Sequence, residues 1–356
     1  MTFENNEKVN LKIDLRNLNQ NETCQYIEDL GEKRFRGKQV FSWVQKGITD
    51  FDELNNIPKM LREKFADSFY ISNIKILEKK ISKIDETIKY LLELGDGNVI
   101  EAVLMKYKYG YSLCVSSQVG CRMGCSFCAS TLNGLVRSLS AGEILGQLLT
   151  IQKDIEAKIG HIVLMGIGEP FDNYDNVTKF FEIVNDKDGI NLGLRNITVS
   201  TCGVVDKIMQ LAEEYPQINL AISLHSAIDE VRTQMMPINK KYNLEKIIDV
   251  CRQYIKKTNR RITFEYTLVK GKNDSKEAID ALVKYVRGLN CHINLIPLNQ
   301  VVENGMQGLE RKKAKDIADY LESRGVSATV RRQLGADIDG ACGQLRMKRE
   351  IATSSC

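Results

Sequence analysis

The sequence predicts an α/β protein, a partial (βα)6-type barrel with a small N-terminal helical accessory domain. Apolar segments rich in β-branched residues alternate with amphipathic helical segments from residue 141 onward. Strands that alternate with helices in this way form parallel sheets with right-handed crossovers. The pattern repeats about six or seven times, too few for a closed eight-stranded barrel. An open or partial barrel is therefore expected.

The elements of this barrel can be placed along the chain by their periodicity. The expected strands are residues 161–165, 196–201, 219–224, 261–269, 292–297 and 327–332. The expected helices are residues 141–156, 174–185, 204–214, 244–257, 275–287 and 308–324. Ser140 with Glu143 predicts a capping box for the first helix, and Ser275 offers a cap for another. Functional residues in such folds gather where the strands end.

The chain divides into four expected regions. Residues 1–74 form the helical accessory domain, with short helices over residues 23–30, 37–46 and 57–68. Residues 75–106 carry β-type segments around the turn Asp96-Gly97-Asn98 and are expected to be a β-hairpin linker. Residues 107–340 form the core barrel. Residues 341–356 form a C-terminal segment.

Composition narrows the class of protein. The N-terminus is polar, and no run of about 18 apolar residues occurs, so we expect a cytoplasmic protein without a membrane partner. In such a compartment the ten cysteines are expected to be ligands or reactive thiols. The net charge of +4 is too small to establish a nucleic-acid partner, so local basic clusters must support one.

Three cysteines, Cys121, Cys125 and Cys128, follow a Cys-x3-Cys-x2-Cys spacing that lets their sulfurs converge on one inorganic centre. A structural zinc ion or an ordinary electron-transfer cluster takes four protein ligands. A compact set of three therefore suggests a 4Fe-4S cluster with one iron left open for a small molecule.

Small or polar residues stand at the ends of four expected strands. They are Gly168 with Glu169, Ser200, Ser223 and His225 on either side of Leu224, and Asn299. Each has a plain structural alternative, since glycines after a strand often form a turn and a lone histidine is more often a hydrogen-bonding residue. Together they predict a site for a polar ligand at the barrel mouth.

Two further features leave alternatives open. Four cations and three aromatic residues alternate along one stretch: Lys33, Arg34, Phe35, Arg36, Lys38, Phe41 and Trp43. This stretch is either a patch that contacts phosphates and stacks on bases or a solvated helix face above a small core. Cys342 stands in a loop of small residues, where it is either an inert thiol or a flexible nucleophile.

The three-cysteine spacing, the turn at Gly168 and Glu169, and the strand-helix repeat resemble a radical S-adenosylmethionine (SAM) enzyme. Four longer strings resemble one family, the RlmN dual-specificity rRNA and tRNA adenine-C2 methyltransferases. They are SSQVGC at residues 116–121, GIGEP at residues 166–170, SLH at residues 223–225 and ACGQL at residues 341–345. The resemblance covers about residues 11–349. It implies the radical SAM form of the partial barrel and an RNA-binding accessory domain.

The resemblance assigns roles position by position. It implies that Cys121, Cys125 and Cys128 hold the 4Fe-4S cluster, whose open iron chelates SAM. It implies SAM contacts at Gly168, Glu169, Ser200, Ser223, Leu224, His225 and Asn299. It also implies that Cys342 becomes methylated, that Cys114 is the resolving thiol and that Glu101 is the acid/base residue.

The family chemistry consumes two SAM molecules per methyl group. The first methylates Cys342, and the second yields a radical that activates this methyl group for addition to C2 of adenine. A base removes the C2 hydrogen, and Cys114 then attacks the sulfur of Cys342, leaving a disulfide. The implied partners are 23S rRNA near the peptidyl-transferase centre, tRNA beside the anticodon, and an electron donor such as flavodoxin or ferredoxin. A monomer is expected.

Two alternatives remain at this stage. A related antibiotic-resistance enzyme methylates C8 of the same rRNA adenine with similar cysteine roles. A non-enzymatic RNA-binding protein with a zinc or iron-sulfur site is the alternative from another class. The position of the methyl group on the product adenine distinguishes the C8 enzyme from the C2 enzyme. Cleavage of SAM by the protein distinguishes either enzyme from the non-enzymatic RNA-binding protein.

Overall fold

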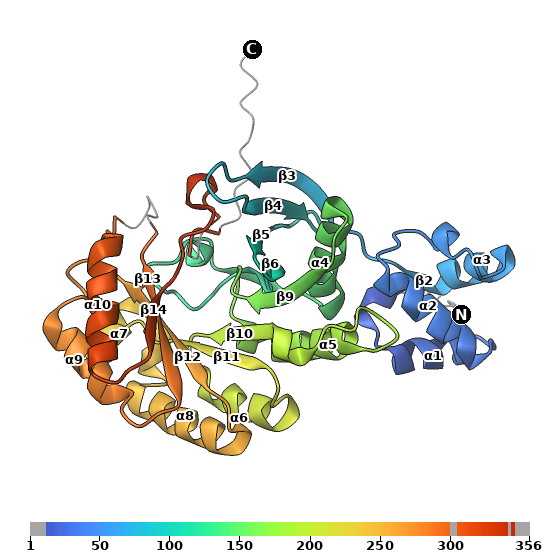
Figure 1. The fold of residues 1–356 in the computed structure, drawn as a ribbon. Coiled ribbons are helices and arrows are strands. Elements are labelled where there is room, and N and C mark those ends of the chain that lie inside the picture. Colours follow the sequence, from blue (N-terminus) through green and yellow to red (C-terminus); the bar gives the residue numbers. More distant parts are fainter. Residues whose placement is uncertain (1–11, 300–304, 341–342, 346–356) are drawn as a thin grey trace, which may run out of the picture.

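The structure, a computed structural model, describes residues 12–299, 305–340 and 343–345. Its centre is a ten-stranded sheet in the order β14-β13-β12-β11-β10-β9-β6-β5-β4-β3. The sheet has two free edges, so it is an open curved sheet and not a closed barrel (Figure 1). The predicted fold class, an α/β partial barrel with a small helical accessory region, is confirmed.

Seven neighbouring strands of the sheet run parallel. They are β6 (Gly110–Cys114), β9 (Ile159–Leu164), β10 (Ile197–Thr201), β11 (Asn219–Ser223), β12 (Ile262–Leu268), β13 (Cys291–Pro297) and β14 (Ala328–Val330). The six strands expected from residue 161 onward are all present. Their apolar residues are buried on both faces, which is why they appear in the sequence as continuous apolar runs.

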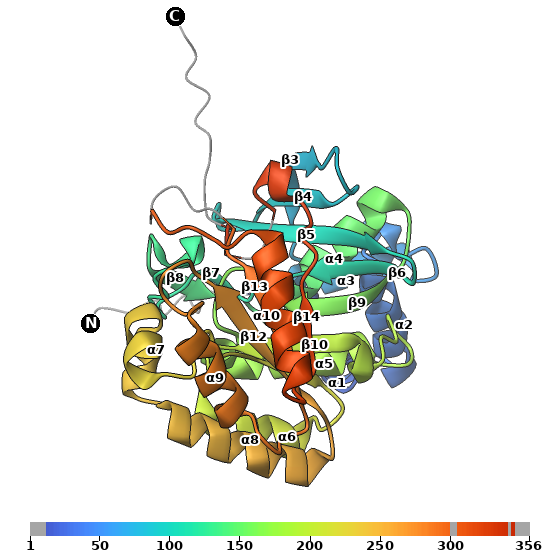
Figure 2. The ribbon, with the colours of Figure 1, turned by 60° about the vertical axis from the view of Figure 1, so that its left-hand side comes forward.

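Helices connect these strands and cover the outer side of the sheet, as Figures 1 and 2 show. They are α4 (Ala141–Ile155), α5 (Tyr174–Asn185), α6 (Val205–Glu214), α7 (Asp229–Met235), α8 (Leu244–Thr258), α9 (Lys276–Tyr285) and α10 (Arg311–Ser323). The six predicted helices are confirmed, with the capping box at Ser140 and the cap at Ser275. The short helix α7 was not predicted. Among the helices of the described residues, none is long and apolar enough to span a membrane.

The region predicted as a hairpin linker is part of the main sheet. β3 (Lys75–Ile81) and β4 (Ile88–Glu93) form the expected hairpin, but β5 (Val99–Tyr107) joins them antiparallel to β6. Residues 99–105 of β5 are all buried, as in a central strand. Residues 75–106 therefore extend the barrel sheet instead of separating two modules, and the linker prediction needs this correction.

The N-terminal module packs around an apolar cluster of its own that includes Leu15, Ile27, Val44 and Phe65. Its elements are β1 (Ile13–Asp14), α1 (Gln20–Asp29), α2 (Arg34–Gln45), α3 (Lys59–Ser68) and β2 (Phe69–Tyr70), with β1 and β2 paired in parallel. Figure 1 shows the module as a separate lobe beside α4 and α5. Phe41 is buried in the main core and not in the module's own cluster.

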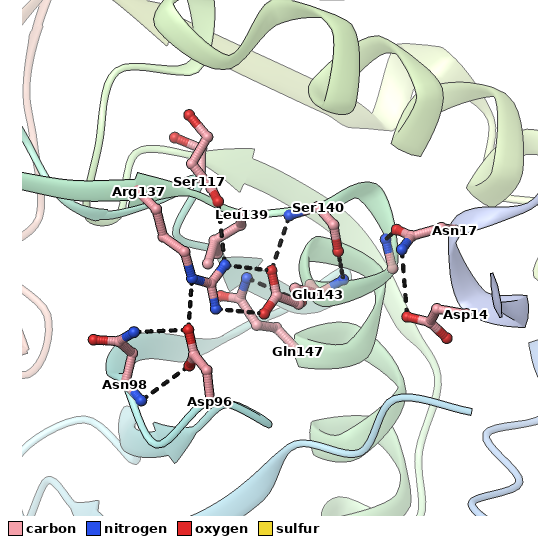
Figure 3. A network of polar contacts seen from close by, with 12 residues as sticks. Asp14, Asn17, Asp96, Asn98, Ser117, Arg137, Leu139, Ser140, Glu143 and Gln147 are labelled. Atoms are coloured by element: carbon pink, nitrogen blue, oxygen red, sulfur yellow. Dashed lines mark hydrogen bonds and ion pairs between the residues drawn. The ribbon is translucent and has the colours of Figure 1, made fainter. Parts of the chain in front are cut away.

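The module is docked on the first turns of α4. The backbone N–H of Gly142 donates to Asn17 Oδ1 over 2.6 Å, and a side chain at Gly142 would meet Arg16 Cβ at 2.9 Å. The same helix end is held by Arg137, which pairs with both Glu143 and Asp96. Figure 3 shows this chain of contacts from the β4–β5 turn through α4 to the module. One polar network thus fixes the lobe relative to the sheet.

This docking predicts a difference between two glycines of α4. Gly142→Ala would push against the Arg16 backbone, whose carbonyl carbon lies 3.0 Å from the added atom, whereas Gly146→Ala meets the flexible end of Ile74. Both changes gain the same helix propensity of about 1 kcal/mol. Gly142→Ala should therefore be less stable than Gly146→Ala by about 1–3 kcal/mol in urea unfolding. Equal stabilities would contradict the close docking.

Candidate functional site: a three-cysteine cavity at the strand ends

The three cysteines lie on a loop clamped by a two-stranded sheet. β7 (Gln118–Gly120) pairs antiparallel with β8 (Leu135–Ser138), and the loop of residues 121–134 lies between them. Gly120 has φ +77°, and a Cβ there would lie 1.9 Å from the Gly134 carbonyl oxygen. Only glycine fits this crossing. The Cys121 N–H donates to the same carbonyl over 2.9 Å, which closes the loop at its base.

A cavity of about 920 Å3, part of it open to solvent, lies at the carboxyl ends of the parallel strands beside this loop. Nine of the predicted site residues line it: Cys121, Cys125, Cys128, Gly168, Glu169, Ser200, Ser223, His225 and Asn299. They come from the cysteine loop and from the ends of β9, β10, β11 and β13. The structure thus brings together residues from a span of nearly 180 positions.

The donor set of the cavity fits an iron-sulfur cluster, which Cys121, Cys125 and Cys128 would hold. Burial raises the pKa of Cys121 to about 12 and that of Cys125 well above its ordinary value, and the nearby Glu169 adds to both shifts. Thiolates in such a place need a cationic partner. Iron held jointly by the three sulfurs supplies one.

Glu169 joins the ends of two strands. Its side chain is buried, Oε1 accepts from the Phe171 N–H over 3.1 Å, and Oε2 accepts from the Cys202 N–H over 2.8 Å. Gly168, with φ +110°, lets the chain pass Gln118, whose Cβ would lie 2.6 Å from an added side chain. Burial raises the pKa of Glu169, although these hydrogen bonds act to lower it. The carboxylate is therefore a fixed acceptor facing the cavity.

His225 is held as a neutral ring. Its Nδ1 accepts from the Thr267 N–H over 2.9 Å, and its ring packs edge-on against Phe127 with centroids 4.6 Å apart. Burial, together with the positive charge of the nearby Arg232, lowers the pKa of His225 to about 3. The ring proton then lies on Nε2, available to a ligand. Leu224 differs from its neighbours because its side chain is in the main core and does not line the cavity.

The opposite wall carries polar residues that the sequence analysis did not single out. Glu265 is buried, accepts from Asn294 Nδ2 over 2.8 Å and lies 4.0 Å from Arg331 Nη1. Glu265, Thr267 and Arg331 all line the cavity. Their only signal in the sequence is that they stand on or just after β12 and β14, among apolar strand residues. No short motif marks them.

The end of the described chain lies across the cysteine loop. The Ala129 N–H donates to the Gly343 carbonyl over 2.8 Å, and Ser130 Oγ donates to the Leu345 carbonyl over 2.9 Å. Gly343 lines the cavity. Cys342, the predicted methylated residue, lies outside the described residues. The residue that follows it in the chain is nevertheless at the cavity wall.

Cys114 and Glu101 are buried outside the cavity lining, on β6 and β5. Cys114 packs in one apolar cluster with Leu345, Met105 and Ile167, so it is next to the C-terminal segment. Lys89 Nζ lies 2.7 Å from Glu101 Oε1 and donates to the Asp339 carbonyl over 3.1 Å. One lysine therefore connects Glu101 to the segment that leads to residue 342. No motif in the sequence marks this contact.

The open parallel sheet with a three-cysteine loop at its strand ends defines a radical SAM protein. Residues 115–283 match the Radical SAM superfamily model. A crystal structure of a radical SAM methyltransferase from Sphaerobacter thermophilus superposes with a TM-score of 0.91 at 38% identity, covering 94% of this chain and all of that one. Proteins of this superfamily hold a 4Fe-4S cluster and SAM.

The particular family is identified by the N-terminal module and by relatives that match nearly the whole chain. Residues 13–71 match the Ribosomal RNA large subunit methyltransferase N-terminal domain. Two proteins named "Probable dual-specificity RNA methyltransferase RlmN" match nearly the whole chain. The one from Clostridium novyi (strain NT) is 52% identical to this chain, and the one from Clostridioides difficile (strain 630) is 50% identical. These matches cover 93% and 95% of this chain and 96% and 98% of the relatives. The chain belongs to the RlmN family.

The lowered pKa of His225 can be tested directly. Ring 15N chemical shifts of cluster-free protein, assigned with a His225→Asn variant, should show a neutral ring at pH 5, where an ordinary histidine with a pKa of about 6.5 is protonated. The pKa of His225 is about 3 in the folded protein and about 6.5 in the unfolded chain. Between these two pH values the unfolded chain therefore binds more protons than the folded protein. The contribution of His225 to stability then falls as the pH decreases through this window, by up to about 1.4 kcal/mol per pH unit. Titration near 6.5 would contradict the buried neutral ring.

Proposed function

We propose that this protein methylates C2 of an adenine in 23S rRNA and of the adenine beside the anticodon in tRNA, through S-methylated Cys342. One observation carries the proposal: Gly343 is hydrogen-bonded to the cysteine loop and lines the cavity that Cys121, Cys125 and Cys128 line. A radical SAM site whose wall includes Gly343, the residue after Cys342 in the chain, fits methyl transfer through that cysteine. Family membership supports RNA as the substrate.

The cavity residues bind and orient SAM. Cys121, Cys125 and Cys128 would hold the cluster, which when bound would supply the electron that cleaves SAM. The fixed carboxylate of Glu169 would accept a hydrogen bond from the amino group of SAM. The hydroxyls of Ser200 and Ser223 and the amide of Asn299 supply further polar contacts, and His225 offers its Nε2 proton. The apolar ring of Phe127 excludes water from this side of the cavity.

The chemistry of the target explains why a tethered thiol is needed. C2 of adenine is an electrophilic carbon that carries a hydrogen, so it cannot displace a methyl group from SAM. Cys342 accepts the methyl group by displacement and then carries its carbon, after hydrogen removal, into a covalent bond with C2. Glu101 takes the C2 proton, and the unpaired electron of the adduct would return to the oxidised cluster that Cys121, Cys125 and Cys128 would hold. The thiolate of Cys114 then attacks the sulfur of Cys342, and the bond from that sulfur to the methylene carbon breaks. Its electron pair passes into the adenine ring, the carbon takes up a proton to become the methyl group, and a disulfide is left that must be reduced.

RNA contacts are proposed on the cavity side of the molecule. Lys240 and Lys241 are exposed beside Pro237, which packs on the cysteine loop, and residues 311–313 are exposed at the start of α10. These positions follow the carboxyl ends of β11 and β13. Lys256, Lys257, Arg260 and Arg261 lie instead at the opposite edge, where β12 begins, and are not proposed as contacts.

One part of the basic stretch on α2 is an exposed surface, and the other part packs into the protein core. Phe35 is 49% exposed with the Arg36 guanidinium 4.7 Å from its ring centroid, and Lys33 and Lys38 are exposed beside it. Phe41 and Trp43 pack inward. The outer face around Phe35 is therefore the part proposed to stack on or bind RNA. This supports the N-terminal module, residues 1–74, as the RNA-binding accessory domain.

The working form of the protein is proposed to be a cytoplasmic monomer. The cavity is lined by residues of a single chain, and folded rRNA and tRNA are cytoplasmic substrates. The electron is proposed to come from a flavodoxin or ferredoxin. Extruding an adenine from folded RNA requires local unstacking, which the accessory module can assist.

The function is tested by anaerobic assay of the reconstituted protein with SAM, reductant and each RNA. Mass spectrometry of the nucleosides should find 2-methyladenosine in both RNAs, and the Cys125→Ala variant should produce none. Methylation at C8 would instead assign the protein to the antibiotic-resistance relatives. Failure to cleave SAM would support a non-enzymatic RNA-binding protein.

The resolving role of Cys114 predicts a trapped intermediate. Cys114→Ala protein should accumulate a covalent adduct with RNA on denaturing gels, because nothing attacks the sulfur of Cys342. Cys251→Ala removes another buried cysteine, in α8, and should turn over normally. A Cys114→Ala enzyme that turns over freely without adduct would refute the role.

Glu101→Gln should keep SAM cleavage but lose methylated product by about 10²–10⁴-fold, the usual contribution of a general base. Lys89→Met should also lower product formation because Lys89 holds both Glu101 and residue 339. Glu86→Gln, which removes an exposed carboxylate paired with Lys106, is the control. Product rates equal to the control would exclude Glu101 as the base.

A further inference from the structure

Arg232 is a fully buried cation beneath the cavity. It lies on α7, has 0% exposure and donates five hydrogen bonds to oxygen atoms. Nε donates to the Leu224 carbonyl, Nη1 to Asn239 Oδ1 and the Tyr242 carbonyl, and Nη2 to the carbonyls of Cys202 and Ser223. The distances run from 2.6 to 3.4 Å. Its donors are thus engaged with two strand ends and the loop after α7.

All of these acceptors are neutral. Among the described residues, the carboxylate of Asp229 attracts the guanidinium electrostatically but is hydrogen-bonded to Asn239, at 2.9 Å, and not to Arg232. Arg16, the other fully buried arginine, lies instead at the docking face on α4. A buried charge with no anion in contact is costly unless a counter-charge lies close by. The occupant of the cavity is the natural candidate.

The position of Arg232 brings its charge to the iron-sulfur site. Cys202 and Ser223, whose carbonyls it holds, both line the cavity, and Met235 on the same helix accepts from the Ser126 N–H of the cysteine loop over 2.9 Å. The guanidinium is therefore linked through two backbone carbonyls to the cavity wall and through its own helix to the cysteine loop.

We propose that Arg232 is the internal counter-charge of the iron-sulfur site, a positioning residue that makes reduction of the cluster easier while it holds the ends of β10 and β11. Three thiolates leave the oxidised site anionic, and the electron from the donor protein adds one more negative charge. A fixed buried cation favours the more negative, reduced state. The same guanidinium orders the strand ends that carry Ser200 and Ser223. The inference rests on the cluster of the proposed function but not on RNA methylation.

The test is the midpoint potential of the cluster in full-length reconstituted protein, followed by electron paramagnetic resonance without RNA or SAM. Arg232→Met should lower the equilibrium constant for one-electron reduction at least tenfold, a shift of about 59 mV to more negative potential. Arg232→Lys keeps the charge and should remain close to the natural protein. Arg16→Met, which removes a buried charge at the docking face, should leave the potential unchanged.

A shift in Arg232→Met no larger than in Arg16→Met would overturn the proposal, as would an equal shift in Arg232→Lys. If Arg232→Met does not hold a cluster, the comparison passes to Arg232→Gln, whose amide keeps part of the hydrogen bonding. Cluster loading in the Lys variant but in neither neutral variant would support the counter-charge. Loss of the cluster in all three would overturn it. Because RNA is absent, a failure here is distinct from a failure of methyl transfer.

Discussion

Two hydrogen bonds between the cysteine loop and the C-terminal segment connect the parts of this site. The Ala129 N–H and Ser130 Oγ hold the carbonyls of Gly343 and Leu345. More than 200 residues of chain separate these partners, so the contact exists only when the sheet between them has formed. Leu345 then packs with Cys114 in one apolar cluster. The segment thereby joins a cavity suited to SAM cleavage with a second thiol buried behind it.

The charged and titratable groups at and beneath the cavity are buried and held by fixed hydrogen-bond partners. Glu169 is buried but its oxygens accept backbone N–H groups, His225 is buried and neutral, and Arg232 is buried and cationic. Each is placed by backbone contacts at strand ends, so none has to move when a ligand enters. Such fixed groups act strongly because little water screens them. The glycines at 120 and 168 allow the close crossings that bring them together.

Much of this could be predicted because the signals are local. Apolar periodicity located the strands and helices, and the cysteine spacing located the ligand loop. The carboxyl ends of parallel strands meet at one edge, so Glu169, Ser200 and Asn299 were expected together. The burial of β5 in the main sheet was not predicted, since pairing depends on strands far apart in sequence. Lys89, Arg232 and Glu265 were missed for the same reason: their partners lie on other elements, and no motif marks them.

The account is tested most directly by the state of the cysteines after catalysis. Protein that has methylated RNA without a thiol reductant can be digested and its cysteine peptides identified by mass spectrometry. The contacts of Gly343 and Leu345 predict a disulfide between Cys114 and Cys342 in amounts that match the methylated adenine. Product formed while both cysteines remain thiols, or a disulfide that joins Cys342 to a different cysteine, would contradict the arrangement described here.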